Sequence, residues 1–288
     1  MLKRRRSSLD SAKSLSVIPE LKTQKLVVTN SLATKKQKLQ ADYSTTSPFP
    51  NFAHPTATET QEVYDLLCKH HAGGSQVKRA SGSSKRTPNV IESLISTILS
   101  QNTTASNSTR AKAGLDAAFG RNDYASIVEA PVDRVAASIR CGGLANKKAV
   151  TIQKLLNSIK ARHGDYSLQH LAASGEGKKM DDEAIMKELV SYDGVGPKTA
   201  SCVLLFCLGR DSFAVDTHVF RLSKLLGWVP AGADRVLTQA HLDLRVPNDL
   251  KYGLHVLFIR HGRACRGCKS SSSIEKCILK DYLHQLSC

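Results

Sequence analysis

The sequence contains no apolar run long enough to span a bilayer, so we expect no transmembrane segment. The alternation typical of β-strands is also scarce, whereas apolar residues recur at helical spacing in many stretches, which predicts an all-α fold. Acidic residues are in deficit, because 41 Lys and Arg against 25 Asp and Glu give a net charge of +16. This excess points to a polyanionic partner, although a basic composition alone is weak evidence. An apolar fraction of 41% in 288 residues is enough for a soluble globular protein of one large domain or two modest ones.

Residues 1–54 lack a sustained amphipathic pattern and are rich in Ser, Thr, Lys and Gln, so we expect a disordered basic tail. The tail carries ten Lys and Arg against three Asp and Glu. Two basic clusters, Lys3-Arg4-Arg5-Arg6 and Lys35-Lys36-Gln37-Lys38, are typical of a nuclear localisation signal. A solvated tail that attracts nucleic acid nonspecifically is the simpler interpretation. A mitochondrial presequence is the alternative address, against which Asp10 and the weak amphipathicity count.

A tight turn at Asp193-Gly194-Val195-Gly196-Pro197 separates two stretches of helical periodicity. Two glycines two positions apart allow backbone angles that are closed to other residues, and Pro197 suits the first turn of the next helix. The free N–H groups at that helix start can receive a phosphate, because the glycines are too small to block it. Lys198 and Thr199 follow in the first turn, where a cation is unfavourable to the helix dipole. Lys198 is therefore oddly placed for a purely structural residue.

Taken together, the GVG turn, Lys198, an apolar helix and the segment Val215-Asp216-Thr217-His218 resemble the helix-hairpin-helix (HhH-GPD) glycosylases of base-excision DNA repair, and among them endonuclease III. The resemblance extends over most of residues 88–263 and includes His261-Gly262-Arg263. It implies that Lys198 is the Schiff-base lysine and Asp216 the catalytic aspartate. It also implies that Gly194, Val195, Gly196 and Thr199 belong to a phosphate-binding hairpin. The simpler interpretations are a solvated lysine and a helix N-cap at Asp216, and His218 is expected to be a buried or supporting group.

The chemistry of base removal explains why these residue types are needed. Breaking an N-glycosidic bond builds positive charge on the sugar, which a nearby carboxylate stabilises. A lysine amine that attacks C1′ forms a Schiff base, and the imine acidifies the 2′ hydrogen so that the 3′ phosphate leaves by β-elimination. Relatives that only hydrolyse the bond lack this lysine, so Lys198 favours a bifunctional glycosylase and apurinic/apyrimidinic (AP) lyase.

The resemblance also implies an architecture and a partner. We expect two helical lobes, a barrel of residues 88–210 and a second lobe of residues 55–87 with 211–288, with Lys198 and Asp216 on opposite walls of the cleft. The substrate is expected to be double-stranded DNA that contains a damaged or modified base or an abasic site. Among damaged bases we expect an oxidised pyrimidine. No cofactor is required and a monomer is expected. The alternatives are a glycosylase of the same fold acting on 5-methylcytosine or 8-oxoguanine, a monofunctional hydrolase, and a noncatalytic DNA-binding protein.

Two further segments match places where the family contacts DNA. An apolar helix over residues 90–99 ends in Ser100-Gln101-Asn102-Thr103-Thr104, and in endonuclease III an amide side chain at this tip fills the gap left by the extruded base. Asn102 aligns with that filler and Gln101 is its neighbour, although a polar tip is also a common helix cap. The segment LSQNTT, residues 99–104, also resembles the plant 5-methylcytosine glycosylases of the DEMETER type.

A second turn, Cys141-Gly142-Gly143-Leu144, precedes Ala145, Asn146, Lys147 and Lys148. In the family the leucine matching Leu144 is pressed into the base stack, and ordinary core packing is the alternative. Lys147 and Lys148 are predicted phosphate contacts, or else solvent-facing charges. Further helices are expected over residues 113–119, 127–139, 149–159, 222–226, 233–242 and 250–260.

The cysteines near the end depart from the family pattern. Endonuclease III carries a four-cysteine [4Fe–4S] site after its HGR segment, with spacings of six, two and five residues, whereas Cys265, Cys268, Cys277 and Cys288 are separated by two, eight and ten. We therefore expect no iron–sulfur cluster, although four thiols with one CxxC pair leave zinc or a differently built cluster as an alternative. Cys68, Cys141, Cys202 and Cys207 fall on apolar faces and are predicted to be buried thiols, and disulfides are not expected.

Overall fold

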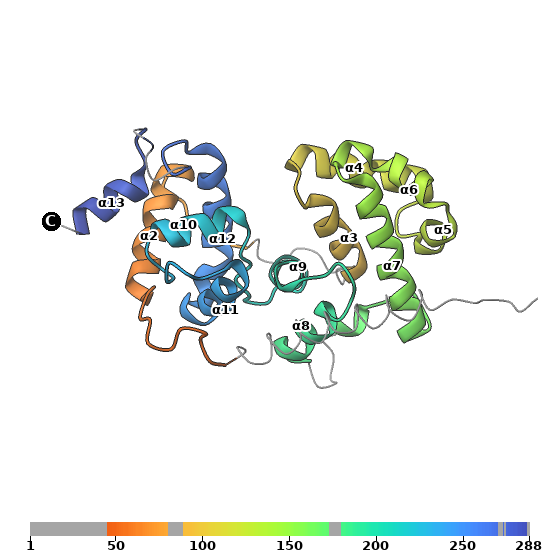
Figure 1. Ribbon diagram of the computed structural model, residues 1–288, viewed down its shortest axis with the longest axis horizontal. Helices are drawn as coiled ribbons and strands as arrows, with labels where there is room; N and C mark the ends of the chain where they lie inside the picture. Colours follow the sequence, from red (N-terminus) through yellow and green to blue (C-terminus); the bar gives the residue numbers. More distant parts are fainter. Residues whose placement is uncertain (1–44, 80–88, 173–179, 270–272, 274, 287–288) are drawn as a thin grey trace, which may run out of the picture.

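The computed structural model describes residues 45–79, 89–172, 180–269, 273 and 275–286. Throughout these residues the chain forms helices joined by turns, and no strand occurs in them, so the all-α prediction is confirmed. None of the helices in this part of the chain combines the length and the apolar character that a membrane crossing requires. Figure 1 shows two groups of helices, with α9 and α8 lying between and below them.

The first core is built by helices that follow one another along the chain. It gathers buried apolar side chains from Val90 to Leu204, and α3 contributes six of them. The elements of this lobe are α3 (Val90–Ser100), α4 (Ala105–Phe119), α5 (Tyr124–Glu129), α6 (Val132–Ser138), η1 (Arg140–Gly142), α7 (Ala145–His163), η2 (Gln169–Ala172), α8 (Asp182–Val190), α9 (Pro197–Cys202) and the π-helical turn η3 (Val203–Cys207).

The second core joins the beginning of the described chain to its end. Buried side chains of residues 63–68 pack with those of residues 213–279, and Trp228 and Phe258 are among the largest of them. α12 packs against both α2 and α10 and so forms the centre of this lobe. Its helices are α2 (Ala57–His71), α10 (Thr217–Leu225), α11 (Arg235–Arg245), α12 (Asn248–Ala264) and α13 (Ile278–Leu286).

Three details differ from the sequence-based expectations. The single helix expected over residues 127–139 is two, α5 and α6, and the break falls at Pro131, which lacks the N–H that a continuous helix needs. The helix α13 was not expected at all. Residues 45–54, assigned from the sequence to the disordered tail, lie against α11, where the rings of Phe49 and Phe52 contact His241. Residues 1–44 lie outside the described part of the chain.

Candidate active site

The hairpin between α8 and α9 is held by one glycine and left open by the other. Gly194 has φ +82°, and a Cβ built there would lie 2.2 Å from the Cγ2 atom of Thr151 on α7. Only glycine therefore allows the turn to pack on α7. Val195 is buried in the first core and its N–H donates to the carbonyl of Tyr192 at 3.1 Å. Gly196 is the N-cap of α9 without a side-chain capping bond, and no atom lies within 4 Å of a Cβ built there. Gly196, Lys198 and Thr199 all line one cavity, so the start of α9 faces open space.

Lys198 lies in the first turn of α9, half-buried, with Thr199 buried beside it. Burial raises the pKa of Cys202 one turn further along, and the nearby positive charge of Lys198 acts in the opposite direction. Lys198 lines a cavity together with Thr199.

Asp216 is the N-cap of α10, as the simpler interpretation of the sequence had it. Its Oδ1 atom accepts hydrogen bonds from the N–H groups of His218 and Val219, both at 2.8 Å. Across the described residues, the second oxygen, Oδ2, accepts no hydrogen bond. The cap fixes the carboxylate with one oxygen on the helix and leaves the other for a group in the cavity, so capping and chemistry do not compete for the same atom.

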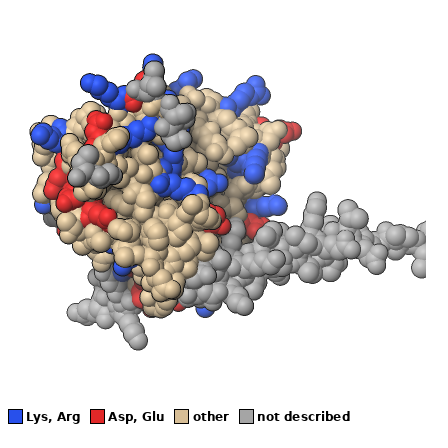
Figure 2. All heavy atoms as spheres, turned by 60° about the vertical axis from the view of Figure 1, so that its left-hand side comes forward, with Lys and Arg blue, Asp and Glu red and all other residues tan. Residues whose placement is uncertain are grey.

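One cavity of about 620 Å³ brings the two residues together. Lys198 comes from the first lobe and Asp216 from the second. Gln101, Asn102, Gly194, Gly196 and Thr199 also line this cavity, together with Thr217 and His218. The exposed guanidinium groups of Arg235 and Arg263 add positive charge to its lining. Figure 2 shows Lys and Arg side chains near the centre of one face and around its rim, while several Asp and Glu side chains cluster toward one edge.

A buried polar network ties the two walls of the cavity to each other. Gln239 on α11 donates from Nε2 to the hydroxyl of Ser201 on α9 at 2.9 Å, and its Oε1 accepts from the N–H of Val215 at 3.2 Å. Ser201 in turn shares a 2.7 Å hydrogen bond with Ser212. Because Val215 precedes Asp216, this network sets the position of the carboxylate relative to the helix that carries the lysine. The sequence offers no local signal for it, since Gln239 sits in an ordinary amphipathic helix.

His255 is a buried residue of α12 that was not singled out from the sequence. Its Nδ1 shares a 2.7 Å hydrogen bond with the carbonyl of Ala214. Burial lowers the pKa of His255 to about 4, the charge of Lys198 adds to this effect, and that of Asp216 opposes it. His255 is therefore a neutral packing group at neutral pH, and it supports the backbone two residues before Asp216.

His218 packs against the segment that the sequence singled out as HGR. A Cβ on Gly262 would lie 2.8 Å from the imidazole, so this glycine makes room for the ring. The same backbone brings Arg263 to the cavity. The two motifs thus meet where α10 packs on α12.

The tip of α3 is where the sequence predicts the gap-filling amide. Gln101 caps α3, and its Nε2 donates to the hydroxyl of Thr199 at 3.4 Å. Asn102 has φ +50°, a left-handed conformation that asparagine tolerates better than most residues. Both residues line the cavity beside Lys198.

Leu144 is a surface residue, so the alternative of core packing is wrong. Its side chain is 53% exposed and its backbone has φ +52°, an uncommon conformation for a leucine. It opens α7 beside an exposed Lys147 and lines a separate hollow with Arg140 and Lys147. An exposed apolar side chain held in a strained turn is consistent with a contact to bases.

The prediction that Lys148 contacts phosphate is wrong. Its side chain is 3% exposed, and its Nζ donates to the carbonyls of Leu99 and Gly142, both at 2.8 Å. Burial lowers the pKa of this amine. Lys148 therefore caps the end of α3 and ties it to the turn before α7, because this position faces the core while Lys147 faces solvent.

The terminal cysteines separate into three that the structure describes and one that it does not. Cys265, Cys268 and Cys277 come together beside His261, and Cys288 lies outside the described residues. Of the thiols predicted to be buried, Cys68 and Cys202 are so, whereas Cys141 and Cys207 are half-buried. All seven described cysteines are free thiols.

Comparison with known proteins identifies the family. Residues 95–248 match the model of the HhH-GPD superfamily base excision DNA repair proteins. A protein of Arabidopsis thaliana named as a candidate DNA glycosylase is 37% identical over 248 residues, 78% of this chain and 82% of that protein. Endonuclease III of Sulfolobus acidocaldarius is 30% identical over 198 residues, 68% of this chain and 82% of its own.

The fold agrees with this assignment. The structure of a trapped endonuclease III–DNA covalent intermediate superposes with a TM-score of 0.55 at 25% identity, over 75% of this chain and 90% of that one. The chain belongs to the HhH-GPD superfamily of base excision DNA repair proteins, and within it to the DNA glycosylases.

Proposed function

We propose that the protein excises a damaged or modified base from double-stranded DNA and then cleaves the abasic site as an AP lyase, with Lys198 as the nucleophile. The observation that carries this proposal is that Lys198 and Asp216, from different lobes, line one cavity together with the start of α9. A relative supports this type of reaction, because the endonuclease III of the compared structure forms a covalent intermediate with DNA. A protein that only binds DNA needs the hairpin but neither of these two residues.

The cavity has to receive an extruded nucleotide, because the glycosidic carbon cannot be reached inside the base stack. Asn102 and Gln101 then occupy the space left in the duplex, and Leu144 presses into the neighbouring stack. Gly194, Val195, Gly196 and Thr199 bring backbone N–H groups to a phosphate at the start of α9. Arg263, Arg235 and Lys147 add positive charge along the path of the backbone.

The reaction begins as the glycosidic bond weakens and positive charge builds on the sugar, which the free oxygen of Asp216 stabilises. The deprotonated amine of Lys198 attacks C1′ and the base leaves with the bonding electrons. Ring opening of this adduct, in which the C1′–O4′ bond breaks and O4′ leaves as the 4′ hydroxyl, gives an imine on Lys198. Removal of a 2′ proton then expels the 3′ phosphate, and hydrolysis of the imine releases the lysine. The preferred base is expected to be an oxidised pyrimidine, with 5-methylcytosine and 8-oxoguanine as the alternatives.

Borohydride trapping on an abasic-site duplex tests this proposal directly. The wild-type chain should give a covalent protein–DNA adduct, and Lys198→Gln should lose it. Lys154→Gln, which removes an exposed lysine on α7, is the matched control and should trap normally. Trapping by Lys198→Gln at the wild-type level would show that another amine is the nucleophile. A panel of duplexes with single lesions, scored for strand cleavage, identifies the preferred base.

The protein is proposed to act in the nucleus and as a monomer. The basic clusters at Lys3-Arg4-Arg5-Arg6 and Lys35-Lys36-Gln37-Lys38 support the nuclear address, with the mitochondrion as the alternative. A fluorescent fusion should accumulate in the nucleus, and exchange of the first cluster for alanines should reduce that accumulation. Light scattering of the purified chain, with and without a short duplex, tests the monomer.

A further inference from the structure

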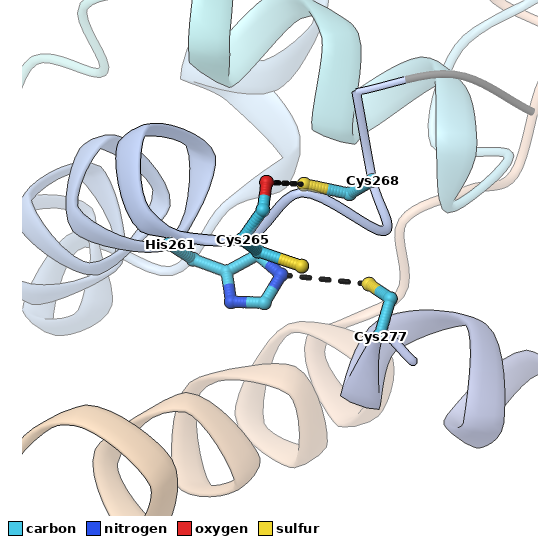
Figure 3. Close-up of side chains that lie close together, drawn as sticks. All are labelled: His261, Cys265, Cys268 and Cys277. Carbon is cyan, nitrogen blue, oxygen red and sulfur yellow. Dashed lines mark hydrogen bonds between the residues drawn. The ribbon is translucent and has the colours of Figure 1, made fainter. Parts of the chain in front are cut away.

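A compact group of four potential metal ligands lies in the second lobe, outside the residues that line the catalytic cavity. The imidazole of His261 and the thiols of Cys265, Cys268 and Cys277 place their ligand atoms within 4.8 Å of one another. Figure 3 shows the imidazole and the three sulfur atoms converging from the end of α12, the turn after it and the chain just before α13. His261, Cys268 and Cys277 are buried, at 1%, 4% and 3% exposure.

Neighbouring groups hold these side chains in a ligand-like orientation. The Nε2 of His261 faces the cluster, 3.5 Å from the sulfur of Cys277, while its Nδ1 shares a 2.9 Å hydrogen bond with Nε2 of His71 on α2. An imidazole whose second nitrogen is hydrogen-bonded in this way is typical of metal-bound histidine. On the other side, Arg221 contacts the sulfur of Cys268 at 3.5 Å with its Nη2 atom.

The backbone between the ligands is also shaped for close approach. A Cβ on Gly267 would lie 2.4 Å from the carbonyl oxygen of Glu275 and 2.6 Å from that of Lys276. Any other residue in the Cys265-Arg266-Gly267-Cys268 turn would therefore push away the segment that carries Cys277. The glycine makes room for the third thiol to meet the first two.

The donor set does not fit a [4Fe–4S] cluster of the kind that endonuclease III carries. Such a cluster takes four cysteine thiolates, and its iron and sulfide atoms separate the cysteine sulfurs from one another. Among the described residues the fourth donor is an imidazole, and the ligand atoms crowd together without space for a cuboid. Three thiolates and one histidine are instead a common donor set for structural zinc.

We propose that His261, Cys265, Cys268 and Cys277 bind a structural zinc ion in tetrahedral Cys₃His coordination. With Zn–S near 2.3 Å and Zn–N near 2.0 Å, neighbouring ligand atoms in such a site lie roughly 3 to 4 Å apart, so small side-chain adjustments close the observed arrangement. The ion joins the end of α12 to the start of α13. It also stabilises the backbone that leads to Arg263, which lines the catalytic cavity.

The decisive measurement is the metal content of the full-length, unmutated chain, purified without chelator. We expect a single zinc ion per chain and no acid-labile sulfide. Exchange for Co²⁺ should give the intense visible spectrum of tetrahedral cobalt with sulfur ligands, and removal of zinc should lower the Tm. Iron with sulfide, or a metal-free chain that takes up neither zinc nor cobalt, would overturn the proposal. These readouts do not depend on lyase activity, so they stand apart from the test of Lys198.

Variants assign the ligands. Cys277→Ser and His261→Asn should each lose the zinc, whereas Cys141→Ser, a half-buried thiol of the other lobe, should retain it. Cys288→Ser is the informative comparison, because the sequence alone grouped Cys288 with the other three thiols. Loss of zinc in Cys288→Ser together with its retention in His261→Asn would refute the assignment. If a ligand variant does not fold, the cobalt spectrum of the wild-type chain still distinguishes sulfur-rich tetrahedral coordination from its absence.

Discussion

Alanine at the two hairpin glycines should cause two different defects, because the glycines have different surroundings. Gly194→Ala places a Cβ 2.2 Å from Cγ2 of Thr151 and forces an alanine to φ +82°. The left-handed conformation costs about 1–2 kcal/mol. Overpacking against a side chain fixed by its own hydrogen bond to the carbonyl of Lys147 costs roughly 1–3 kcal/mol more. We therefore expect a loss of about 2–5 kcal/mol in the free energy of unfolding.

Gly196→Ala should leave the fold intact. Gly196 has φ −105°, which alanine adopts readily, and a Cβ there meets no atom within 4 Å. The stability should be unchanged, or higher by up to about 1 kcal/mol because the unfolded chain loses entropy. Gly196 lines the cavity, however, so the added methyl group hinders the approach of a phosphate to the start of α9. DNA affinity should then fall by about tenfold or more, which corresponds to about 1.4 kcal/mol.

Urea unfolding and fluorescence anisotropy with an abasic-analogue duplex, at one fixed salt concentration, separate the two defects. Adding Thr151→Ser to Gly194→Ala removes Cγ2 but keeps the hydroxyl, so it should recover the steric part of the loss and leave the conformational part. The reasoning fails if Gly194→Ala is as stable as the wild type, or if Thr151→Ser recovers nothing. Normal DNA binding by Gly196→Ala would show that no phosphate approaches this turn.

Three other predictions follow from single side chains. Asp216→Asn keeps an oxygen that can cap α10, so the fold and DNA binding should persist. Base excision should fall by roughly 10²–10³-fold in single-turnover assays, because the carboxylate charge is lost. Unchanged turnover would remove the carboxylate from the mechanism. Lys148→Met leaves two buried carbonyls unpaired and should lower the free energy of unfolding in urea by about 2–4 kcal/mol. The control Lys147→Met should lower it by less than about 0.5 kcal/mol, because Lys147 is exposed. Equal losses would contradict the buried position of Lys148. The pKa of His255 is lowered to about 4, so the unfolded chain binds this proton first as the pH falls. Stability should therefore be complete above about pH 6.5 and decrease toward pH 4, with a smaller decrease in His255→Gln; an unchanged pH profile in that variant would exclude His255 as its source.

The candidate site was largely predictable from local sequence, because it depends on short segments. The turn around Gly194 and Gly196, Lys198 in a first helical turn and Asp216 before a helix are each set by residues within a few positions of one another. Leu144 could also be found in this way, since two preceding glycines force a sharp turn. Lys148 could not, because a neighbouring Lys147 looks the same in one dimension and only the direction of α7 against α3 buries one of them.

The supporting residues lay beyond local reading for a similar reason. Gln239 is 38 residues from the serine to which it donates, and His71 is 190 residues from His261. No periodicity or motif encodes such distances. For the same reason the sequence grouped Cys288 with the other terminal thiols, whereas the structure brings His261 to them.

By itself the sequence determined the all-helical fold, the hairpin and the identities of a lysine and an aspartate suited to base removal, because helix periodicity and turn chemistry act over a few residues. Tertiary packing decided that the two residues line one cavity, which lysine is exposed, and which four side chains converge between the end of α12 and the start of α13. These outcomes depend on the burial of two separate cores and on the polar contacts between them, and such contacts join residues that are far apart along the chain.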